Sequence, residues 1–453
     1  MFKIADLARA ANGSLISGNK DSFVDGISTD SRLIKPRFAF LAIKGDKFDG
    51  HDFIEEVVRR GIDTVIVSSL QFNSRLQGLN SLNIIEVKDT TKALGDIARF
   101  WRKRFKIPVI AVTGSNGKTT TKEMIAHVLS LKFKVLKNEG TKNNHIGVPL
   151  TLLNLDESFD LAVIELGTNH FGEIDYLSKI CQPNIGLITN IGPSHLEFLK
   201  DLNGVCQEKY SLIKNLRLPN FGILNADDIN LNGKINANKR LLSFGIARKA
   251  DFSVSKLKSN ANKLEFFVNN AKNKFVLNTF GRHNLYNALA AISIARIFGL
   301  SYEKIASGLK SFDFPSGRFQ LKKVNNFTFI DDTYNSNPNS LLQAIKAFAD
   351  YKAGGRKIIV MGDMLELGKS SDVLHKEAGK HAAGVCDAFI AVGRLSGLAA
   401  KAMQEYGFNR NNIFICDSSK KARDILLNKI SINDRDVILV KGSRSMKMEE
   451  VFK

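Results

Sequence analysis

The sequence contains few cysteines, no long apolar run and an excess of basic over acidic residues. Its four cysteines, Cys181, Cys206, Cys386 and Cys416, are far apart, which excludes a disulfide framework or a C-x-x-C zinc site. No apolar run approaches the roughly 20 residues that a membrane-spanning helix needs. The first residues include Asp6 and alternate in polarity where a signal peptide would be continuously apolar. We therefore expect a cytoplasmic protein with reduced thiols and no membrane insertion.

The excess of positive charge raises the question of nucleic-acid binding. The chain has 65 Lys and Arg against 45 Asp and Glu, a formal net charge of +20. The basic residues are scattered, for example through the Asn-rich stretch 260–274, without a dense run or interleaved aromatic residues. A lysine-biased solvated surface explains this pattern better than a nucleic-acid site. Its positive field would raise the encounter rate with anionic substrates such as nucleotides.

A glycine-rich loop follows an apolar, strand-like run in residues 110–121, which read I-A-V-T-G-S-N-G-K-T-T-T. The glycines let successive backbone N–H groups point into one concavity, Lys118 adds a mobile positive charge, and the Thr119 hydroxyl can bind Mg²⁺. Val112 stands where the longer form of this motif has glycine, and an ordinary turn is the alternative. The sequence predicts a nucleoside triphosphate site at Gly114, Ser115, Asn116, Gly117, Lys118, Thr119 and Thr120.

The whole chain reads as an α/β protein of three blocks, because 453 residues exceed one hydrophobic core. Residues 1–85 alternate short strands with a helix and predict a small α/β domain. Residues 86–313 contain the phosphate loop in an alternation of helices and buried strands, which is typical of a doubly wound, mostly parallel sheet. Residues 314–453 repeat this rhythm and predict a Rossmann-like domain.

The expected elements follow from apolar periodicity. We predict strands at 39–43, 64–67, 161–166, 184–191, 327–330, 357–361, 388–392 and 437–440. We predict helices at 53–60, 91–105 and 122–131. Each strand of the last block is expected to lead into glycine or polar residues and then a helix. Two open sheets in one chain imply a cleft between them that closes by domain motion.

Two polar side chains follow strands that should lie beside the phosphate loop. Glu165 ends the run L-A-V-I-E, and His195 comes just after G-L-I-T-N-I-G-P-S. In a doubly wound sheet, ligands bind at the carboxyl ends of the strands. A carboxylate and an imidazole there could complete Mg²⁺ coordination opposite Thr119, although His is the less usual Mg²⁺ ligand. For His195, a structural hydrogen-bonded histidine is the alternative.

The first block has weaker features, each of which alone is as consistent with a surface turn. They are the run 28–32, S-T-D-S-R, then Lys44-Gly45 and Asp49-Gly50-His51. Arg32 could pair bidentately with a phosphate, and the glycine turns would let backbone approach a ligand.

Seven stretches, in order along essentially the whole chain, resemble the Mur ligases. They are V-T-G-S-N-G-K-T-T-T-K-E-M from 112, N-N-H-I-G-V-P-L-T-L-L from 143, E-L-G-T-N from 165, I-G-P-S-H-L-E from 191, G-R-H-N-L-Y-N-A-L-A-A from 281, G-R-F-Q from 317 and D-D-T-Y-N-S-N-P from 331. Within the family, Y-N-S-N-P and G-D-M-L-E-L-G are most similar to members that add a D-alanyl-D-alanine dipeptide. The D-N-P-R motif of the diaminopimelate-adding members is absent.

The resemblance implies a monomeric, three-domain ligase that makes the UDP-muramoyl-pentapeptide for peptidoglycan synthesis. The ligase would use ATP and two Mg²⁺ ions as cofactors, and it would activate the tripeptide as an acyl phosphate. Carried over from the family, the nucleotide contacts would include His283, Asn284, Asn287, Arg318 and Asp332, and the metal ligands Thr119, Glu165, His195 and Lys209. The implied catalytic set is Lys118, Glu165, His195, Lys209 and Arg318. Substrate contacts would come from Ser31, Arg32, Lys44, Asp49, His51, Asn143, Asn144, Tyr334, Asn335 and Asn337.

Lys209 occupies the position that family members carbamylate with CO₂. A carbamate would turn a cationic amine into an anionic oxygen ligand for the second Mg²⁺, whereas the alternative is a plain surface lysine on a helix. The sequence departs from the family pattern at Ser211, where an acidic residue is usual, and at His145, where Glu is common.

Two other functions stay open on the sequence alone. One is a sibling ligase that adds diaminopimelate, lysine or glutamate to a related substrate with the same ATPase. The other is a non-catalytic scaffold or basic nucleic-acid binder that retains the fold. The identity of the third peptide residue is not indicated.

Overall fold

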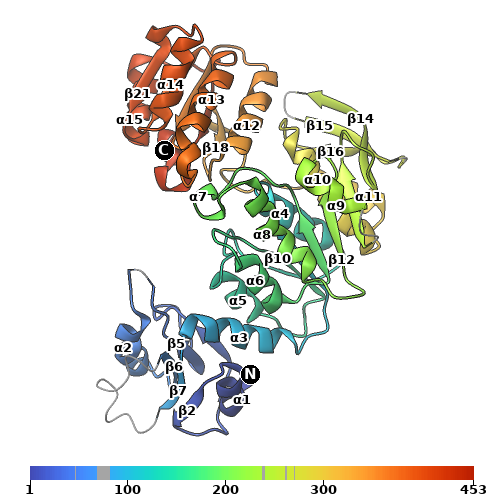
Figure 1. Cartoon of the computed structure of the whole chain (residues 1–453), viewed down its shortest axis with the longest axis vertical. Coiled ribbons are helices and arrows are strands. Elements are labelled where there is room, and N and C mark those ends of the chain that lie inside the picture. Colours follow the sequence, from blue (N-terminus) through green and yellow to red (C-terminus); the bar gives the residue numbers. More distant parts are fainter. Residues whose placement is uncertain (46, 69–81, 237–239, 261–262, 270) are drawn as a thin grey trace.

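The computed structural model describes residues 1–45, 47–68, 82–236, 240–260, 263–269 and 271–453. Three sheet-bearing units follow one another along the chain, and the predicted α/β class is confirmed. Figure 1 shows the N-terminal unit (blue) at one end, the central unit (cyan to yellow) in the middle and the third unit (orange to red) at the other end. Among the described residues, no helix is long and apolar enough to span a membrane.

The N-terminal unit, residues 1–89, is built on a five-stranded sheet in the order β2-β7-β6-β5-β4. All neighbouring strands are parallel except β2 and β7. The elements are β1 (Phe2–Lys3), α1 (Ile4–Ala10), β2 (Ser14–Ser17), β3 (Phe23–Val24), β4 (Gly26–Ser28), β5 (Phe38–Leu41), α2 (Ile54–Arg59), β6 (Thr64–Ser68) and β7 (Asn83–Val87). The expected domain boundary after residue 85 falls inside β7, so we describe this unit up to residue 89.

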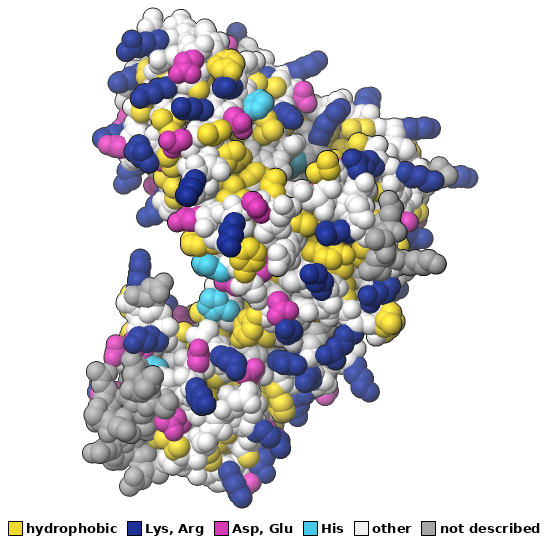
Figure 2. All heavy atoms as spheres, in the orientation of Figure 1, with side chains coloured by type: hydrophobic (Ala, Val, Ile, Leu, Met, Phe, Trp, Pro, Cys, Tyr) yellow, Lys and Arg dark blue, Asp and Glu magenta, His cyan; other side chains and the backbone are white. Residues whose placement is uncertain are grey.

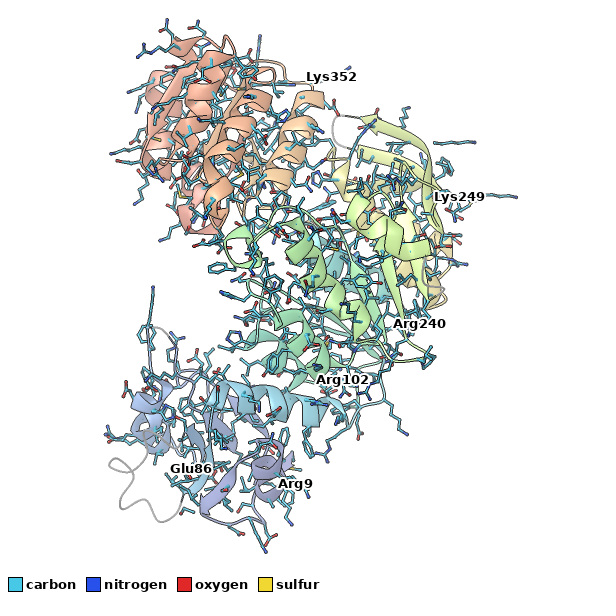
Figure 3. The ribbon with its side chains drawn as sticks, viewed as in Figure 1. Arg9, Glu86, Arg102, Arg240, Lys249 and Lys352 are labelled. Atoms are coloured by element: carbon cyan, nitrogen blue, oxygen red, sulfur yellow. The ribbon has the colours of Figure 1, made fainter. Side chains whose placement is uncertain are left out.

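Helix α3 (Thr90–Arg102) joins the N-terminal unit to the central unit and contributes to the cores of both. Its Ala93, Leu94 and Ile97 pack in the N-terminal core, whereas Ala98 belongs to a core under the central sheet. In its last turn the buried guanidinium of Arg102 donates hydrogen bonds to the carbonyl oxygens of Cys181, Phe105 and Ile107. Figure 3 shows Arg102 at this junction. The two units are therefore fixed to each other by apolar packing and by a buried cation.

The central unit, residues 90–313, has a nine-stranded sheet in the order β16-β15-β14-β13-β12-β11-β8-β10-β9. The strands from β9 to β14 run parallel to β8 in the middle, and β15 is antiparallel to both of its neighbours, β14 and β16. The strands are β8 (Val109–Thr113), β9 (Val135–Lys137), β10 (Leu161–Glu165), β11 (Ile185–Ile188), β12 (Phe221–Asn225), β13 (Leu241–Gly245), β14 (Phe252–Asn260), β15 (Lys263–Val268) and β16 (Phe275–Leu277).

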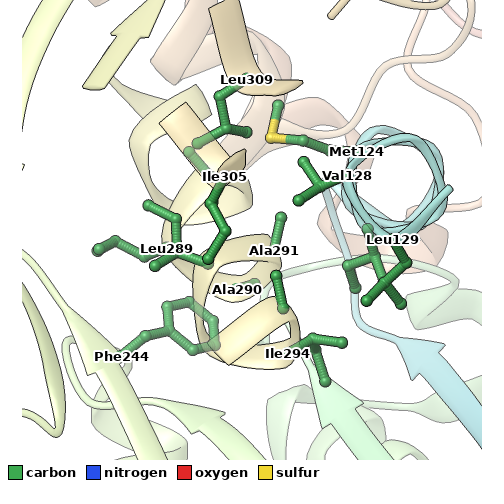
Figure 4. Packing of buried hydrophobic residues seen from close by; sticks show 14 of the residues in the cluster. Met124, Val128, Leu129, Phe244, Leu289, Ala290, Ala291, Ile294, Ile305 and Leu309 are labelled. Carbon is green, nitrogen blue, oxygen red and sulfur yellow. The ribbon is translucent and has the colours of Figure 1, made fainter. Parts of the chain in front are cut away.

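The helices of the central unit cover both faces of this sheet. They are α4 (Lys118–Leu129), α5 (Gly147–Leu152), α6 (Glu173–Cys181), α7 (Leu196–Leu199), α8 (Leu202–Lys214), α9 (Ile229–Asn236), α10 (His283–Ile297) and α11 (Tyr302–Lys310). Figure 4 shows the largest core, where Met124 and Val128 of α4 pack against Ala291 and Ile294 of α10 and against α11. This packing holds the first turns of α4 and α10 at the same end of the sheet.

The third unit, residues 314–453, has a six-stranded sheet in the order β17-β18-β22-β19-β20-β21. The four predicted strands are confirmed as β18 (Phe327–Asp332), β19 (Lys357–Gly362), β20 (Ala388–Val392) and β22 (Val437–Lys441). The structure adds the antiparallel edge strand β17 (Gln320–Val324) and the parallel strand β21 (Ile413–Cys416). The helices are α12 (Pro338–Asp350), α13 (Ser371–Ala383), α14 (Ser396–Glu405) and α15 (Ser419–Asp424). The expectation of a helix after the last strand is wrong, because β22 leads into two 3₁₀ turns.

The three units enclose an open notch on one side of the molecule. Figure 2 shows this notch between the N-terminal unit below and the third unit above, with histidine side chains at its edge. Lys and Arg are spread over all three units on this face and do not gather in one patch.

Candidate active site

The phosphate loop connects β8 to α4, as predicted, and both glycines adopt left-handed backbone conformations. Gly114 has φ +145° and Gly117 has φ +78°. A Cβ at Gly114 would lie 1.9 Å from Oγ1 of Thr189, and one at Gly117 would lie 2.5 Å from Oδ1 of Asn287. Any other side chain would clash at both positions. Helix α4 therefore begins at Lys118, four residues before the predicted start, and its free N–H groups face the loop.

The loop is held in shape by the residues that follow β11. Asn190 accepts a hydrogen bond from the N–H of Asn116 and donates one to its carbonyl, each at 3.0 Å. The Thr189 hydroxyl also donates to the Asn116 carbonyl, at 2.6 Å, and Ser115 Oγ donates to the Gly192 carbonyl at 2.9 Å. The anion-receiving backbone is thus pre-organised by a neighbouring strand end.

Lys118 lies folded over the loop. Its Nζ donates to the carbonyl oxygens of Gly114, at 2.8 Å, and Ser115, at 3.3 Å. Burial lowers the pKa of Lys118, and the nearby Glu165 carboxylate partly opposes this shift. A buried cation of this kind is stabilised when an anionic ligand enters.

A cavity of 540 Å³ lies above the loop, between the central and third units. It brings together most of the residues that the sequence predicted for nucleotide, metal and dipeptide. These are Ser115, Asn116, Gly117, Lys118, Thr119, Thr120, Asn143, Glu165, His195, His283, Asn284, Asn287, Arg318, Asp332, Tyr334, Asn335 and Asn337. Gly114, Asn144, Lys209 and the predicted residues of the N-terminal unit are not part of its lining.

Glu165 is 1% exposed and ends β10 beside the phosphate loop. Its Oε1 accepts a hydrogen bond from Asn143 Nδ2 at 2.7 Å. Its Oε2 is buried, and no described residue donates a hydrogen bond to it. An orphaned buried carboxylate oxygen costs free energy, so its position fits a bound cation.

Among the described residues, no group of three or more His, Cys, Asp or Glu side chains is arranged to hold a metal ion. A metal here would therefore need the Thr119 hydroxyl and ligand oxygens in addition to Glu165 and His195. That mixed, oxygen-rich set suits Mg²⁺ in a nucleotide site, where substrate phosphates and water complete the coordination.

His195 also contacts the third unit. Its Nδ1 lies 2.5 Å from Oε2 of Glu366, in the loop after β19. The hydrogen bond from His195 lowers the pKa of Glu366. His195 and Glu366 both have left-handed backbone conformations, with φ +52° and +62°.

The third unit reaches the phosphate loop with two further side chains. Arg318 Nη2 donates to Thr119 Oγ1 at 3.1 Å, and its guanidinium lies 3.7 Å from the centre of the Tyr334 ring. Asn337 caps α12 through its Oδ1, while its Nδ2 donates to Asn116 Oδ1 at 2.7 Å. These contacts join groups more than 190 residues apart in the sequence.

The first turns of α10 form another wall of the cavity. Asn287 Oδ1 accepts from the Thr121 hydroxyl at 3.0 Å, and its Nδ2 donates to Asn284 Oδ1 at 2.9 Å. Burial lowers the pKa of His283 to about 4, so its imidazole is neutral at pH 7. The His283 ring packs edge-on to Phe319 with centroids 5.0 Å apart.

Lys209 lies on α8 and is only 1% exposed, so the alternative of a plain surface lysine is wrong. Burial lowers its pKa well below the usual value, and the positive charge of Lys118 lowers it further. The carboxylate of the adjacent Glu208 accepts hydrogen bonds from the N–H groups of Gly172 and Ile174, each at 2.7 Å. Burial and the charge of Lys118 therefore both disfavour the protonated amine of Lys209.

The two departures from the family pattern have different surroundings. Ser211 Oγ donates to the carbonyl of Glu208 one turn earlier in α8, at 2.5 Å. His145 is exposed beside Asn144, whose Oδ1 accepts from the N–H of Gly147 at the start of α5.

The predicted substrate residues of the N-terminal unit cluster after the ends of its parallel strands. His51 Nδ1 lies 2.6 Å from Asp49 Oδ1, and its Nε2 accepts from the N–H of Ser68 at the end of β6. Lys44 forms an isolated bridge with Asp49. Hydrogen bonds from Arg32 lower the pKa of Asp30 to about 2, and Ser31 is buried.

Sequence reasoning missed several residues of the cavity. They include Thr141, Asn190, Asn225, Asp227, Tyr286, Ser336 and Lys441. Lys441 ends β22 and donates to Asp332 Oδ2 at 2.6 Å and to the Asn335 carbonyl at 2.9 Å. Its place at a strand end, before Gly442-Ser443-Arg444, is the signal that could have found it. Ser336 Oγ is buried, and no described residue hydrogen-bonds to it.

Family models match the chain in three consecutive segments. The Mur ligase family catalytic domain matches residues 23–102, the Mur ligase middle domain residues 112–295, and the Mur ligase glutamate ligase domain residues 317–444. Together they cover most of the chain, in the order that the resemblance implied.

Individual relatives agree with the family models. The chain is 36% identical to UDP-N-acetylmuramoyl-tripeptide–D-alanyl-D-alanine ligase from Haemophilus influenzae, over 100% of this chain and 98% of that protein. It is 32% identical to the ligase of the same name from Bacillus subtilis, over 99% of this chain and 97% of that one.

Solved structures give the same result. The crystal structure of MurF from Acinetobacter baumannii matches with a TM-score of 0.88 at 32% identity, covering 99% of this chain and 97% of that one. MurF ligase from Thermotoga maritima in complex with ADP matches with a TM-score of 0.82 at 28% identity, covering 94% and 96%. The phosphate loop, the cavity between the central and third units, and these matches together show that the chain belongs to the Mur ligase family.

Proposed function

We propose that this protein is an ATP-dependent ligase that joins D-alanyl-D-alanine to UDP-N-acetylmuramoyl-tripeptide, yielding the pentapeptide, ADP and phosphate. The observation that carries the proposal is one cavity in which Lys118 and Thr119 of the phosphate loop face Arg318 of the third unit. Relatives of 32–36% identity over nearly the full chain bear the name of this ligase. The relative from Thermotoga maritima binds ADP.

The reaction needs activation because a peptide carboxylate is a poor electrophile. The tripeptide carboxylate attacks the γ-phosphorus of ATP, giving an acyl phosphate and ADP. The dipeptide amine then attacks the acyl carbon, loses a proton and expels phosphate. Lys118 and Arg318 neutralise charge on the transferring phosphoryl group from opposite sides, and the docked third unit excludes water from the acyl phosphate.

Mg²⁺ fits the donor set of this site. Thr119, Glu165 and His195 would hold it, and the buried, unpaired Oε2 of Glu165 supports that assignment. When bound, Mg²⁺ supplies charge neutralisation on the phosphates. A carbamate on Lys209 would add an anionic oxygen pair for a second ion, and the lowered pKa of the Lys209 amine favours its reaction with CO₂.

The nucleotide base would lie against α10, where His283, Asn284 and Asn287 meet, with Asp332 at the ribose. Asp332 is oriented for this by its buried partner Lys441. The dipeptide would bind at the end of β18, near Tyr334, Asn335 and Asn337. The unpaired hydroxyl of Ser336 supports a ligand at this end of the cavity.

The UDP end of the substrate would bind the N-terminal unit. Ser31, Arg32, Lys44, Asp49 and His51 follow the carboxyl ends of its parallel strands, which is where open α/β sheets bind ligands. Asn143 would contact the peptide arm as it enters the cavity beside Glu165, with Asn144 next to it. The proposal also includes the separate role of each of the three domains. It further includes that the enzyme is monomeric and cytoplasmic.

The test is phosphate release from ATP and Mg²⁺ with UDP-N-acetylmuramoyl-tripeptide, in the diaminopimelate and lysine forms separately. D-alanyl-D-alanine is supplied, omitted or replaced by single amino acids. We expect turnover only with the dipeptide, in step with formation of the UDP-pentapeptide. Turnover with a single amino acid would support the sibling ligase instead. No turnover, together with salt-sensitive DNA binding, would support the scaffold.

A further inference from the structure

The strongest unassigned contact is the pairing of Glu366 with His195 across the boundary between two units. Glu366 belongs to the third unit, in the loop between β19 and α13, and His195 precedes α7 of the central unit. Figure 1 shows α7 at the edge of the central unit that faces the third unit. The side chains meet at 2.5 Å between His195 Nδ1 and Glu366 Oε2.

The backbone reinforces this contact. The N–H of Glu197 donates to the carbonyl of Glu366 at 3.3 Å. A Cβ at Gly368 would lie 3.3 Å from Cα of Glu197, so the two loops approach closely. His195, Glu366 and Gly368 all have positive φ angles, which non-glycine residues adopt only where their surroundings require it. The two segments are therefore shaped for each other.

The contact with Glu366 determines which nitrogen of His195 carries the proton. A carboxylate accepts hydrogen bonds, so Nδ1 carries the proton, and in the neutral imidazole the lone pair is then on Nε2. His195 lines the same cavity as Glu165 and Thr119. A histidine whose Nδ1–H is held by a carboxylate has its ring orientation and tautomer fixed for binding a cation through Nε2.

We propose that Glu366 is a positioning residue, which fixes the His195 tautomer so that the cation site is complete only when the third unit is docked. This inference rests on the proposed function, because it takes His195 as a ligand of the ATP-associated metal. Docking of the third unit thereby becomes a condition for tight metal binding as well as for the approach of Arg318. By reciprocity of coupled equilibria, metal binding also favours the docked arrangement.

The experiment compares Glu366→Ala and Glu366→Gln with Glu197→Ala in the full-length protein. Glu197 is an exposed carboxylate two residues from His195, and no hydrogen bond of its side chain is described, so it matches the charge change without the contact. Thermal denaturation establishes that each variant is folded. The first readout is the dissociation constant of Mn²⁺ in the presence of ADP, and the second is the tautomer of His195 in metal-free protein by nitrogen-15 NMR of labelled histidine.

We expect Glu366→Ala to weaken Mn²⁺ binding by about 10- to 100-fold, as for other partners of ligating histidines. The His195 signal should change from the Nδ1–H form to a mixture of tautomers. Glu366→Gln keeps a hydrogen-bond acceptor and should retain much of the affinity, while Glu197→Ala should match the parent protein. In turnover, the apparent KM for Mg²⁺ should rise while the KM for the tripeptide stays the same.

The inference is overturned if Glu366→Ala binds Mn²⁺ as tightly as the parent protein, or if Glu197→Ala weakens binding equally. It is also overturned if His195 keeps its tautomer without Glu366. These outcomes can be distinguished from a failure of the proposed function, because the tautomer of His195 can be measured even in a protein without ligase activity. A normal ligase with unchanged Mn²⁺ affinity in Glu366→Ala would reject this inference alone.

Discussion

The guanidinium carbon of Arg318 lies over the ring of Tyr334, 3.7 Å from its centre, while Nη2 of Arg318 donates a hydrogen bond to the Thr119 hydroxyl. Tyr334 thus holds a cation of the third unit at the phosphate loop of the central unit. A buried cation–π contact contributes about 1–2 kcal/mol. We expect Tyr334→Leu to lower ligase turnover about 5- to 30-fold.

The control for this contact is Tyr334→Phe, which retains the ring and should retain most of the turnover. Steady-state phosphate release at saturating substrates measures the difference. If Tyr334→Phe loses as much activity as Tyr334→Leu, the hydroxyl and not the ring is the important group.

Lys118 and Lys122 lie one turn apart on α4, and their replacement should affect different properties. Replacing Lys118 should lower turnover, whereas replacing Lys122 should lower the stability of the fold. In the proposed mechanism Lys118 faces the phosphates, so Lys118→Ala should lower turnover by about 10²–10³-fold or more with the fold intact. Near-parental phosphate release from Lys118→Ala would remove this residue from the mechanism.

Lys122 is completely buried, and its Nζ bonds the carbonyls of Asn138 and Gly140 and the carboxylate of Glu123. Lys122→Met leaves the two carbonyl oxygens without this donor and leaves Glu123 with only Lys137 as a partner, so the free energy of unfolding should fall by about 3 kcal/mol. Urea denaturation followed by circular dichroism tests this. An unchanged midpoint would show that water replaces the ammonium group at little cost.

Lys209→Ala should lose most ligase turnover if the residue acts as a carbamate. A small carboxylic acid such as acetate should then restore part of the activity, because it supplies the missing anionic oxygens. Phosphate release with and without the acid measures the rescue. Full activity without any rescue would mean that no carbamate is needed.

Stability should depend on His283 in mild acid. Its pKa is about 4 in the folded protein and about 6.5 when unfolded, so the unfolded state binds the proton first as the pH falls. The contribution of neutral His283 is fully present above the unfolded pKa. It should decline by about 2 kcal/mol at pH 5 relative to pH 8.

His283→Gln should remove this part of the pH dependence. Urea denaturation of both proteins between about pH 5 and 8 gives the difference in slope. Parallel curves would place the pKa of His283 near its ordinary value in the folded protein.

The sequence predicted best those site residues whose position is set by the end of the strand that carries them. Glu165 and the phosphate loop could be located because parallel strands present their carboxyl ends at one edge. Lys441 meets Asp332 at the carboxyl ends of β22 and β18 in the third unit's sheet, but a lysine at a strand end carries no signal of its partner. The contact of Asn337 with Asn116 depends on how two units dock, and nothing in either local sequence encodes that docking.

The fold was predictable for buried strands and less so at the edges of the sheets. Continuous apolar runs identified β10, β19 and β20. The hairpin of β14 and β15 lies next to the edge strand β16, and its apolar residues alternate with Lys, Ser and other polar residues, so neither strand presents a continuous apolar run. The early start of α4 follows from the backbone freedom of Gly117, which periodicity does not register.

Helix α3 has a further consequence, because its side chains belong to two cores and Arg102 ties its last turn to three carbonyls. The N-terminal and central units therefore cannot rotate independently without breaking one core. The separation between the strand ends of the N-terminal unit and the phosphate loop is then a constant of the molecule. In the proposed function, a substrate whose UDP end binds the N-terminal unit must therefore carry a peptide of matching length. One with too short a peptide would not reach the phosphate loop.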